Sequence, residues 1–208
     1  MRKMSDDQRP SFREIESVVE QAEKYRLGTA RLPIDSLSPQ WHSGNGTNRQ
    51  INQKHAMTLA RVFYEEGLKR KSPENHLIVG CSRSQVDAML QVLASRSSGS
   101  AAGERNNTRM ELERAMQSRV PQNQQDDVRE WPLFDGWEAI NGKAELMAGQ
   151  HRVEALKHCI RATGGTGDTT DQVSIRTLGY WECHTLLRSW QAWWVCDLYD
   201  IGAYRPPP

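Results

Sequence analysis

The chain has 208 residues, enough for one elaborated domain with a substantial core rather than two complete domains. Lys and Arg number 27 against 26 Asp and Glu, and a formal net charge of +1 argues against a protein that grips nucleic acid through a broad basic surface. The N-terminal residues hold no apolar signal segment, and no stretch approaches about 18 apolar residues. We therefore expect an intracellular protein, cytoplasmic or nuclear, without membrane contact.

The first third of the chain contains signals for two helices and two strands. Ser11 and Glu14 form a capping box, and apolar residues follow at helical spacing up to Gly28. This pattern predicts an N-terminal helical extension over residues 1–30. Residues 31–39 alternate between two prolines like an edge strand, residues 51–67 form a second amphipathic helix, and residues 76–81 form a buried strand.

The next segment is interpreted as an insertion. Residues 82–128 hold two helical patterns on either side of a low-complexity run at 95–103, which we expect to be flexible. A capping box of Thr108 with Glu111 starts the second helix, which continues to about residue 120 before a polar linker. The predicted organisation is therefore one domain over residues 31–208, interrupted at about 82–128.

The second half of the chain returns to the apolar body with Trp131. The dipeptide Asn141-Gly142 predicts a turn before a strand at 144–148, and a helix follows from Gly149. A short helix around 185–191 precedes a last strand at 193–199, which is apolar on both faces. The predicted fold class is α+β, with a small mixed β-sheet and flanking helices.

The chemistry-bearing motif is Gly149-Gln150-His151-Arg152, at the junction of that strand and helix. Gly149 allows close approach of the backbone, the first helical turn presents N–H groups, and Arg152 adds a planar fork of donors. His151 can donate or accept a hydrogen bond at neutral pH. Together these residues predict a site for phosphate or carboxylate; the alternative is that His151 and Arg152 only cap and solvate the helix.

At this loop the sequence resembles the ParB/sulfiredoxin superfamily. The corresponding motif is G-C-H-R in sulfiredoxins, G-H-H-R in free-serine kinases and G-E-R-R in chromosome-partition ParB proteins. The order of elements over residues 31–81 and 131–200 is similar too. The resemblance implies a nucleotide site in which Gly149, Gln150, His151 and Arg152 hold the phosphates of ATP, ADP or CTP, usually with magnesium.

The chain differs from the family's motifs at several points, and these differences disfavour two of the family's activities. Gln150 stands where sulfiredoxins have their reactive cysteine, and Cys159 is about two helical turns further on, so sulfiredoxin activity is disfavoured. The CTP motifs and the helix-turn-helix of partition ParB proteins are not recognisable, so DNA clamping is disfavoured. The four cysteines, none of them in a C-x-x-C pair, predict small buried hydrophobes rather than a zinc ribbon.

The leading hypothesis is a nucleotide-dependent enzyme, a kinase or an NTP hydrolase. His151 and Arg152 would stabilise the transferring phosphate, and a carboxylate would serve magnesium or the nucleophile. Asp35 is preferred for this role because ligands of open α/β sheets gather at strand ends, although it could equally cap a turn. Four further carboxylates are available: Glu65, Glu66, Glu145 and Glu154. Surface roles are favoured for Glu65 and Glu66, and a surface or structural role for Glu154.

Two other functions stay open. One is a non-catalytic, nucleotide-responsive module that contacts a protein partner through the insertion and the Trp-rich C-terminal region of Trp190, Trp193 and Trp194. Packing is favoured over base stacking for these rings because no basic excess accompanies them. The other is a ParB-like nuclease; DNA as a partner is not favoured, given the net charge of +1. His55, on the apolar face of its helix, is expected to be a partly buried histidine rather than a ligand.

Overall fold

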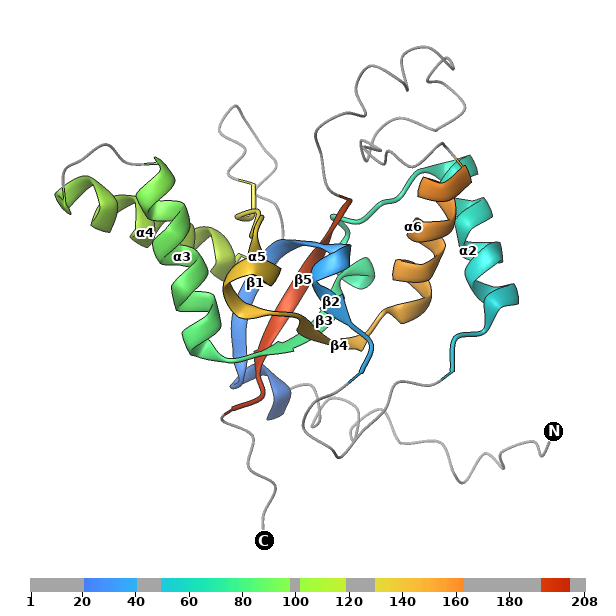
Figure 1. Ribbon diagram of the computed structural model, residues 1–208, viewed down its shortest axis with the longest axis horizontal. Coiled ribbons are helices and arrows are strands. Elements are labelled where there is room, and N and C mark those ends of the chain that lie inside the picture. Colours follow the sequence, from blue (N-terminus) through green and yellow to red (C-terminus); the bar gives the residue numbers. More distant parts are fainter. Residues whose placement is uncertain (1–20, 41–49, 98–101, 119–129, 163–191, 203–208) are drawn as a thin grey trace, which may run out of the picture.

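The computed structural model describes residues 21–40, 50–97, 102–118, 130–162 and 192–202. They form an α+β fold around a five-stranded mixed sheet with the strand order β1-β5-β3-β4-β2 (Figure 1). The predicted class, a small mixed sheet with flanking helices, is confirmed. The strands are β1 (Arg26–Pro33), β2 (Leu37–Ser38), β3 (Leu77–Cys81), β4 (Ala144–Ala148) and β5 (Trp193–Asp200).

Two helix pairs flank the sheet. The helices α2 (Gln53–Glu66) and α6 (Gln150–Ala162) lie side by side, to the right of the sheet in Figure 1. To the left, α3 (Arg83–Ser97) packs on α4 (Ala102–Gln117), with the short α5 (Trp137–Asn141) beside them. Among the helices of the described ranges, none has the length and apolarity needed to cross a membrane.

The sheet curls so that its two edge strands approach each other. β1 pairs antiparallel with β5, β5 parallel with β3, β3 antiparallel with β4, and β4 parallel with β2. Only the 3-residue turn η2 (Ile34–Ser36) links β1 to β2, although these strands occupy opposite edges. Four Cα steps span at most about 14 Å, whereas four strand spacings of a flat sheet measure about 19 Å. The link therefore requires a strongly curved sheet.

One face of the sheet forms the core, because side chains alternate along each strand. Trp194, Cys196 and Leu198 of β5 are fully buried, as are Leu77 and Val79 of β3. Residues of both helix pairs belong to the same core cluster, so α3 and α4 are integrated into the domain.

The other face holds a partly buried polar network around Asp197. Its carboxylate accepts hydrogen bonds from the hydroxyl of Thr29 (2.6 Å) and from Nδ1 of His76 (3.3 Å), and it pairs with Arg26 (3.5 Å). Burial would raise the pKa of Asp197, but these partners outweigh burial and hold the pKa below its usual value. The network joins β1, β5 and the residue before β3.

A second buried polar contact ties the β2–β3 connection to the start of β5. Arg70 is buried, donates to the backbone oxygen of Trp193 (2.8 Å) and lies 3.5 Å from the centre of the Trp193 ring. Trp194, next in the chain, donates from its indole nitrogen to the backbone oxygen of Asn75 (2.9 Å). Trp194 is thus a core residue, as packing rather than base stacking predicts.

Most predicted elements are confirmed, with two corrections. The predicted helix up to Gly28 is wrong at its end, because Arg26–Pro33 is strand. Gly28 has a φ of +144° beside a register shift, and the side chain of Met116 occupies the space that a Cβ would need. The second correction is that α4 begins at Ala102 rather than near Thr108, and α3 extends to Ser97, so both ends of the run at 95–103 that we expect to be flexible are helical. Packing of α4 on α3 outweighs the low helix propensity of Gly103 and the two asparagines that precede Thr108. The expected helices within 1–20 and around 185–191 lie outside the described residues.

Candidate functional site

Gly149 makes the turn from β4 into α6 in a conformation that other residues resist. Its φ is +100°, and a Cβ here would collide with Cδ2 of Leu77 at the start of β3. Its carbonyl accepts hydrogen bonds from the backbone N–H groups of Arg152 (2.9 Å) and Val153 (3.1 Å), so α6 begins directly after it. The predicted order of strand, glycine and helix is confirmed.

The helices α2 and α6 run parallel, with their N-termini at the same end. His151, at the start of α6, contacts Asn52 and His55 at the start of α2. Further along both helices, Sγ of Cys159 donates to the backbone oxygen of Ala60 (3.4 Å). Because each helix N-terminus carries about half a positive charge, this arrangement concentrates positive potential beside the Gly149 loop.

His151 is fixed in one tautomer by the start of α2. The backbone N–H of Asn52 donates to Nε2 of His151 (3.0 Å), so Nε2 carries no proton and the neutral ring bears its proton on Nδ1. The ring of His55 meets the His151 ring edge-on, with 5.0 Å between centroids. Asn52 also caps α2, since its Oδ1 accepts from the N–H of His55 (3.1 Å). The ring of His151 can therefore donate a hydrogen bond to a ligand only from Nδ1–H.

Arg152 points from α6 toward the start of β3. Its Nη2 donates to the backbone oxygen of Glu74 (3.2 Å), in the turn η3 (Pro73–Asn75). The guanidinium is half-buried; burial lowers the pKa of Arg152, and the nearby charge of Glu74 opposes that shift. Gln150, between the glycine and His151, is buried. The loop therefore presents His151 and Arg152, with Glu74 beside the latter.

The charges around the two N-termini favour an anion. Neither α2 nor α6 has an acidic residue in its first turn, where acids usually offset the helix dipole. The basic side chains there are Lys54 and His55 on α2, and His151 and Arg152 on α6. Chemically, this arrangement can bind phosphate or carboxylate and can donate to it from a guanidinium, an imidazole and backbone N–H groups.

Asp35 is not brought to this loop. It lies in η2, exposed, two residues before Leu37, which pairs with Ala144 at the beginning of β4. Gly149 follows the other end of that strand, so about 16 Å of strand separates their levels at about 3.3 Å per residue. Among the described residues, no hydrogen bond or ion pair connects Asp35 to the loop. The carboxylate whose charge acts on the Arg152 guanidinium is that of Glu74.

The other candidates have different surroundings. Glu65 and Glu66 are exposed and pair with Arg61 and Lys69, as a solvated helix end predicts. Glu154 pairs with His158 on its own helix (3.5 Å), and Glu145 is buried in β4. Burial raises the pKa of the Cys159 thiol, which makes it a poor substitute for a reactive cysteine.

His55 corrects one expectation. It is exposed rather than partly buried, because the buried positions of α2 are Ala56 and Phe63 and His55 lies at the edge of that face. The residues that sequence reasoning missed are Asn52, His55 and Glu74. Only Asn52 carried a local signal, as a capping residue before a helix.

These observations define the class of the protein: an α+β domain on a curled mixed sheet, with an electropositive strand-to-helix loop. The family described as "Protein of unknown function (DUF3723) N-terminal domain" matches residues 24–129, about half of the chain, and the chain belongs to this family. The matched region includes α2, α3 and α4 and ends before the Gly149 loop. No curated protein and no solved structure matches the chain.

Proposed function

We propose that the chain is a ParB/sulfiredoxin-like nucleotide-binding domain whose Gly149–Arg152 loop holds the phosphates of ATP, ADP or CTP. The observation that carries the proposal is the convergence of two parallel helix N-termini on this loop, with no acidic residue in either first turn. A bound phosphate would neutralise the concentrated positive potential. Arg152 uses one of its five N–H groups on Glu74, and a phosphate could accept from others.

Turnover is the second part of the proposal, as a kinase or NTP hydrolase. Mg²⁺ needs only one or two carboxylates in addition to phosphate oxygens, and Glu74 next to Arg152 suits that donor set. When bound, the ion would neutralise charge on the phosphates. Arg152 and Nδ1–H of His151 would donate to the transferring phosphoryl oxygens, which gain stabilisation as the bond breaks. Glu74 takes the role that Asp35 was expected to fill.

The binding test is a thermal-shift panel of ATP, ADP, CTP, GTP and inorganic phosphate, with and without magnesium. A ligand at about 100 times its dissociation constant adds roughly 2.7 kcal/mol, or about 5–11 °C for a chain of this size. Arg152→Ala should abolish the ligand-induced shift. The control is Arg114→Ala, which removes an exposed arginine of α4 and should leave the shift unchanged. Equal shifts in wild type and Arg152→Ala would refute the site.

Turnover is tested separately, by release of phosphate or ADP. Glu74→Gln should abolish release while keeping the binding shift, and Asp35→Asn should change neither the release nor the binding shift. Binding without release in the wild type would identify the alternative, a nucleotide-responsive module for a protein partner. Salt-dependent retention on DNA with strand cleavage would instead support the nuclease.

A further inference from the structure

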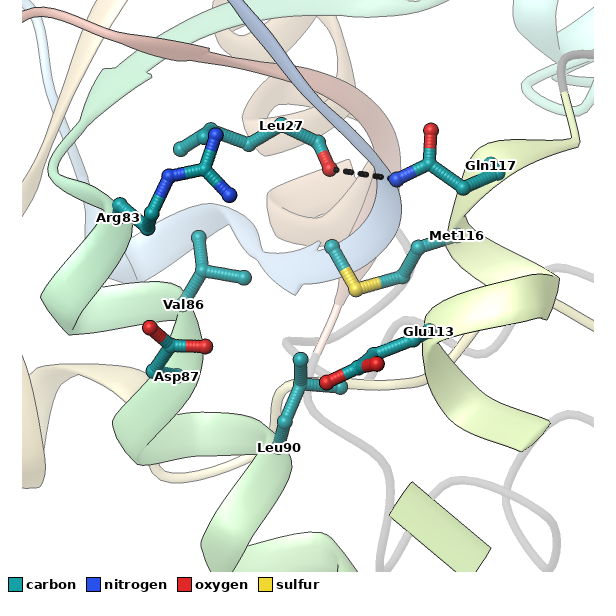
Figure 2. A pocket seen from close by; sticks show the side chains of 8 residues that line it. All are labelled: Leu27, Arg83, Val86, Asp87, Leu90, Glu113, Met116 and Gln117. Carbon is teal, nitrogen blue, oxygen red and sulfur yellow. Dashed lines mark hydrogen bonds between the residues drawn. The ribbon is translucent and has the colours of Figure 1, made fainter. Parts of the chain in front are cut away.

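A separate cavity of about 210 Å³ lies between β1, α3 and α4, away from the Gly149 loop (Figure 2). Its floor is apolar and buried, and consists of Leu27, Val86, Leu90 and Met116. Gln117 closes the seam between α4 and β1 by donating to the backbone oxygen of Leu27 (3.2 Å). A cavity of about 150 Å³ can hold benzene, so this one can hold an apolar group with the size of a leucine or phenylalanine side chain.

Side chains of opposite charge line the rim above this apolar floor. Figure 2 shows the carboxylates of Asp87 on α3 and Glu113 on α4 pointing to the cavity, and the guanidinium of Arg83 on its other side. Arg109 binds one oxygen of each carboxylate, at 2.8 Å from Asp87 Oδ1 and 2.8 Å from Glu113 Oε1. Two carboxylates share one guanidinium, so a net negative charge remains for a cation.

Arg83, an exposed residue, lines the other side of the cavity. Within the described ranges, none of the hydrogen bonds or ion pairs involves its guanidinium. Asp87, one turn further along α3, would be its natural partner, but Asp87 is bound to Arg109. Arg83 also opens α3, which has no acidic residue in its first turn, so the helix dipole adds to its charge rather than offsetting it.

We infer that this cavity binds a free apolar α-amino acid. Its carboxylate would pair with Arg83, its ammonium group with the remaining oxygens of Asp87 and Glu113, and its side chain would cover the apolar floor. The formal charges around the cavity, two arginines (Arg83 and Arg109) and two carboxylates (Asp87 and Glu113), sum to zero. This balance matches a zwitterion and disfavours a ligand with a single charge of either sign. All the lining residues fall within the family-matched region, whereas the Gly149 loop does not, so this site shares no residue with the proposed nucleotide site.

The experiment is an NMR titration of the full 208-residue chain, observed at the methyl groups of Leu27, Val86, Leu90 and Met116. The probes are L-leucine, 4-methylpentanoate, which lacks the amine, and 3-methylbutylamine, which lacks the carboxylate. We expect leucine to shift these methyls with a dissociation constant of about 1 mM or below, and each truncated probe to bind at least about tenfold more weakly.

Two variants locate the contact. Arg83→Gln should weaken leucine at least about tenfold and leave the weak binding of 3-methylbutylamine unchanged. Arg114→Gln removes another exposed arginine, on α4 and outside the cavity, and should change the binding of neither ligand. The inference is overturned if a truncated probe binds as tightly as leucine, if the shifted methyls lie elsewhere, if Arg83→Gln has no effect, or if leucine causes no shift up to about 20 mM.

Discussion

Replacing Gly149 with alanine tests whether the loop owes its shape to the missing side chain. The φ of +100° costs a residue with a Cβ about 1–3 kcal/mol. The new Cβ would also collide with Cδ2 of Leu77, a fully buried residue, and overpacking of this kind costs about 1–3 kcal/mol more. We therefore expect Gly149→Ala to lower the free energy of unfolding by about 2–6 kcal/mol.

Gly142→Ala is the matched control. Gly142 ends α5 with a φ of +70° and a ψ of −157°, and a Cβ there would meet no atom within 4 Å. This variant should show the backbone strain alone, about 1–3 kcal/mol. Urea unfolding followed by fluorescence of the buried Trp137 and Trp194 measures both variants. The difference between them isolates the collision with Leu77.

A double-mutant cycle with Leu77→Ala sharpens the test. If the collision is real, truncating Leu77 removes it, and the double variant should be more stable than the two single losses predict, by about 1–3 kcal/mol. Gly149→Ala with a cost no greater than that of Gly142→Ala, or a cycle without coupling, would refute the reasoning. Glycine would then be required only for its backbone angle, or not required at all.

Two further predictions concern the buried polar contacts of β5. Because its partners lower the folded-state pKa of Asp197, its contribution is present above the unfolded pKa, near 4, and is lost as the pH falls through the folded value. Asp197→Asn should thus cost about 2–4 kcal/mol at pH 7 and less below about pH 4, and a cost that does not change with pH would contradict the role given to the carboxylate. Arg70→Lys should cost about 1–3 kcal/mol, because an ammonium cannot both stack on Trp193 and reach its carbonyl; Lys69→Arg, at an exposed neighbour, should be neutral.

The loop could be predicted from the sequence because its signals are local. An apolar run, a glycine and then apolar residues at helical spacing define the junction of β4 and α6 without reference to the rest of the chain. The same holds for α2, which ends at Gly67 as predicted, and for the buried strand β3. Signals of this kind act over a few residues, so the folded state rarely overrides them.

The surroundings of the loop could not be predicted, because they depend on contacts between distant residues. Asn52 meets His151 from 99 positions away, and neither residue has a pattern that indicates the pairing. The expectation that Asp35 lies at the site depends on an analogy with open α/β sheets, in which strand ends meet at one edge. Here η2 carries the chain from one edge strand to the other, and the strand end faces away from the loop.

The strand order determines which part of the chain can fold alone. The family-matched region, residues 24–129, contains β1, β2 and β3, yet no two of these strands are neighbours in the sheet. Each pairs only with β4 or β5, and β5 lies between β1 and β3. A fragment cut at the family boundary would hold three strands with nothing to pair with, so a foldable unit has to extend through Asp200. During synthesis, the sheet can close only after its last strand has been made.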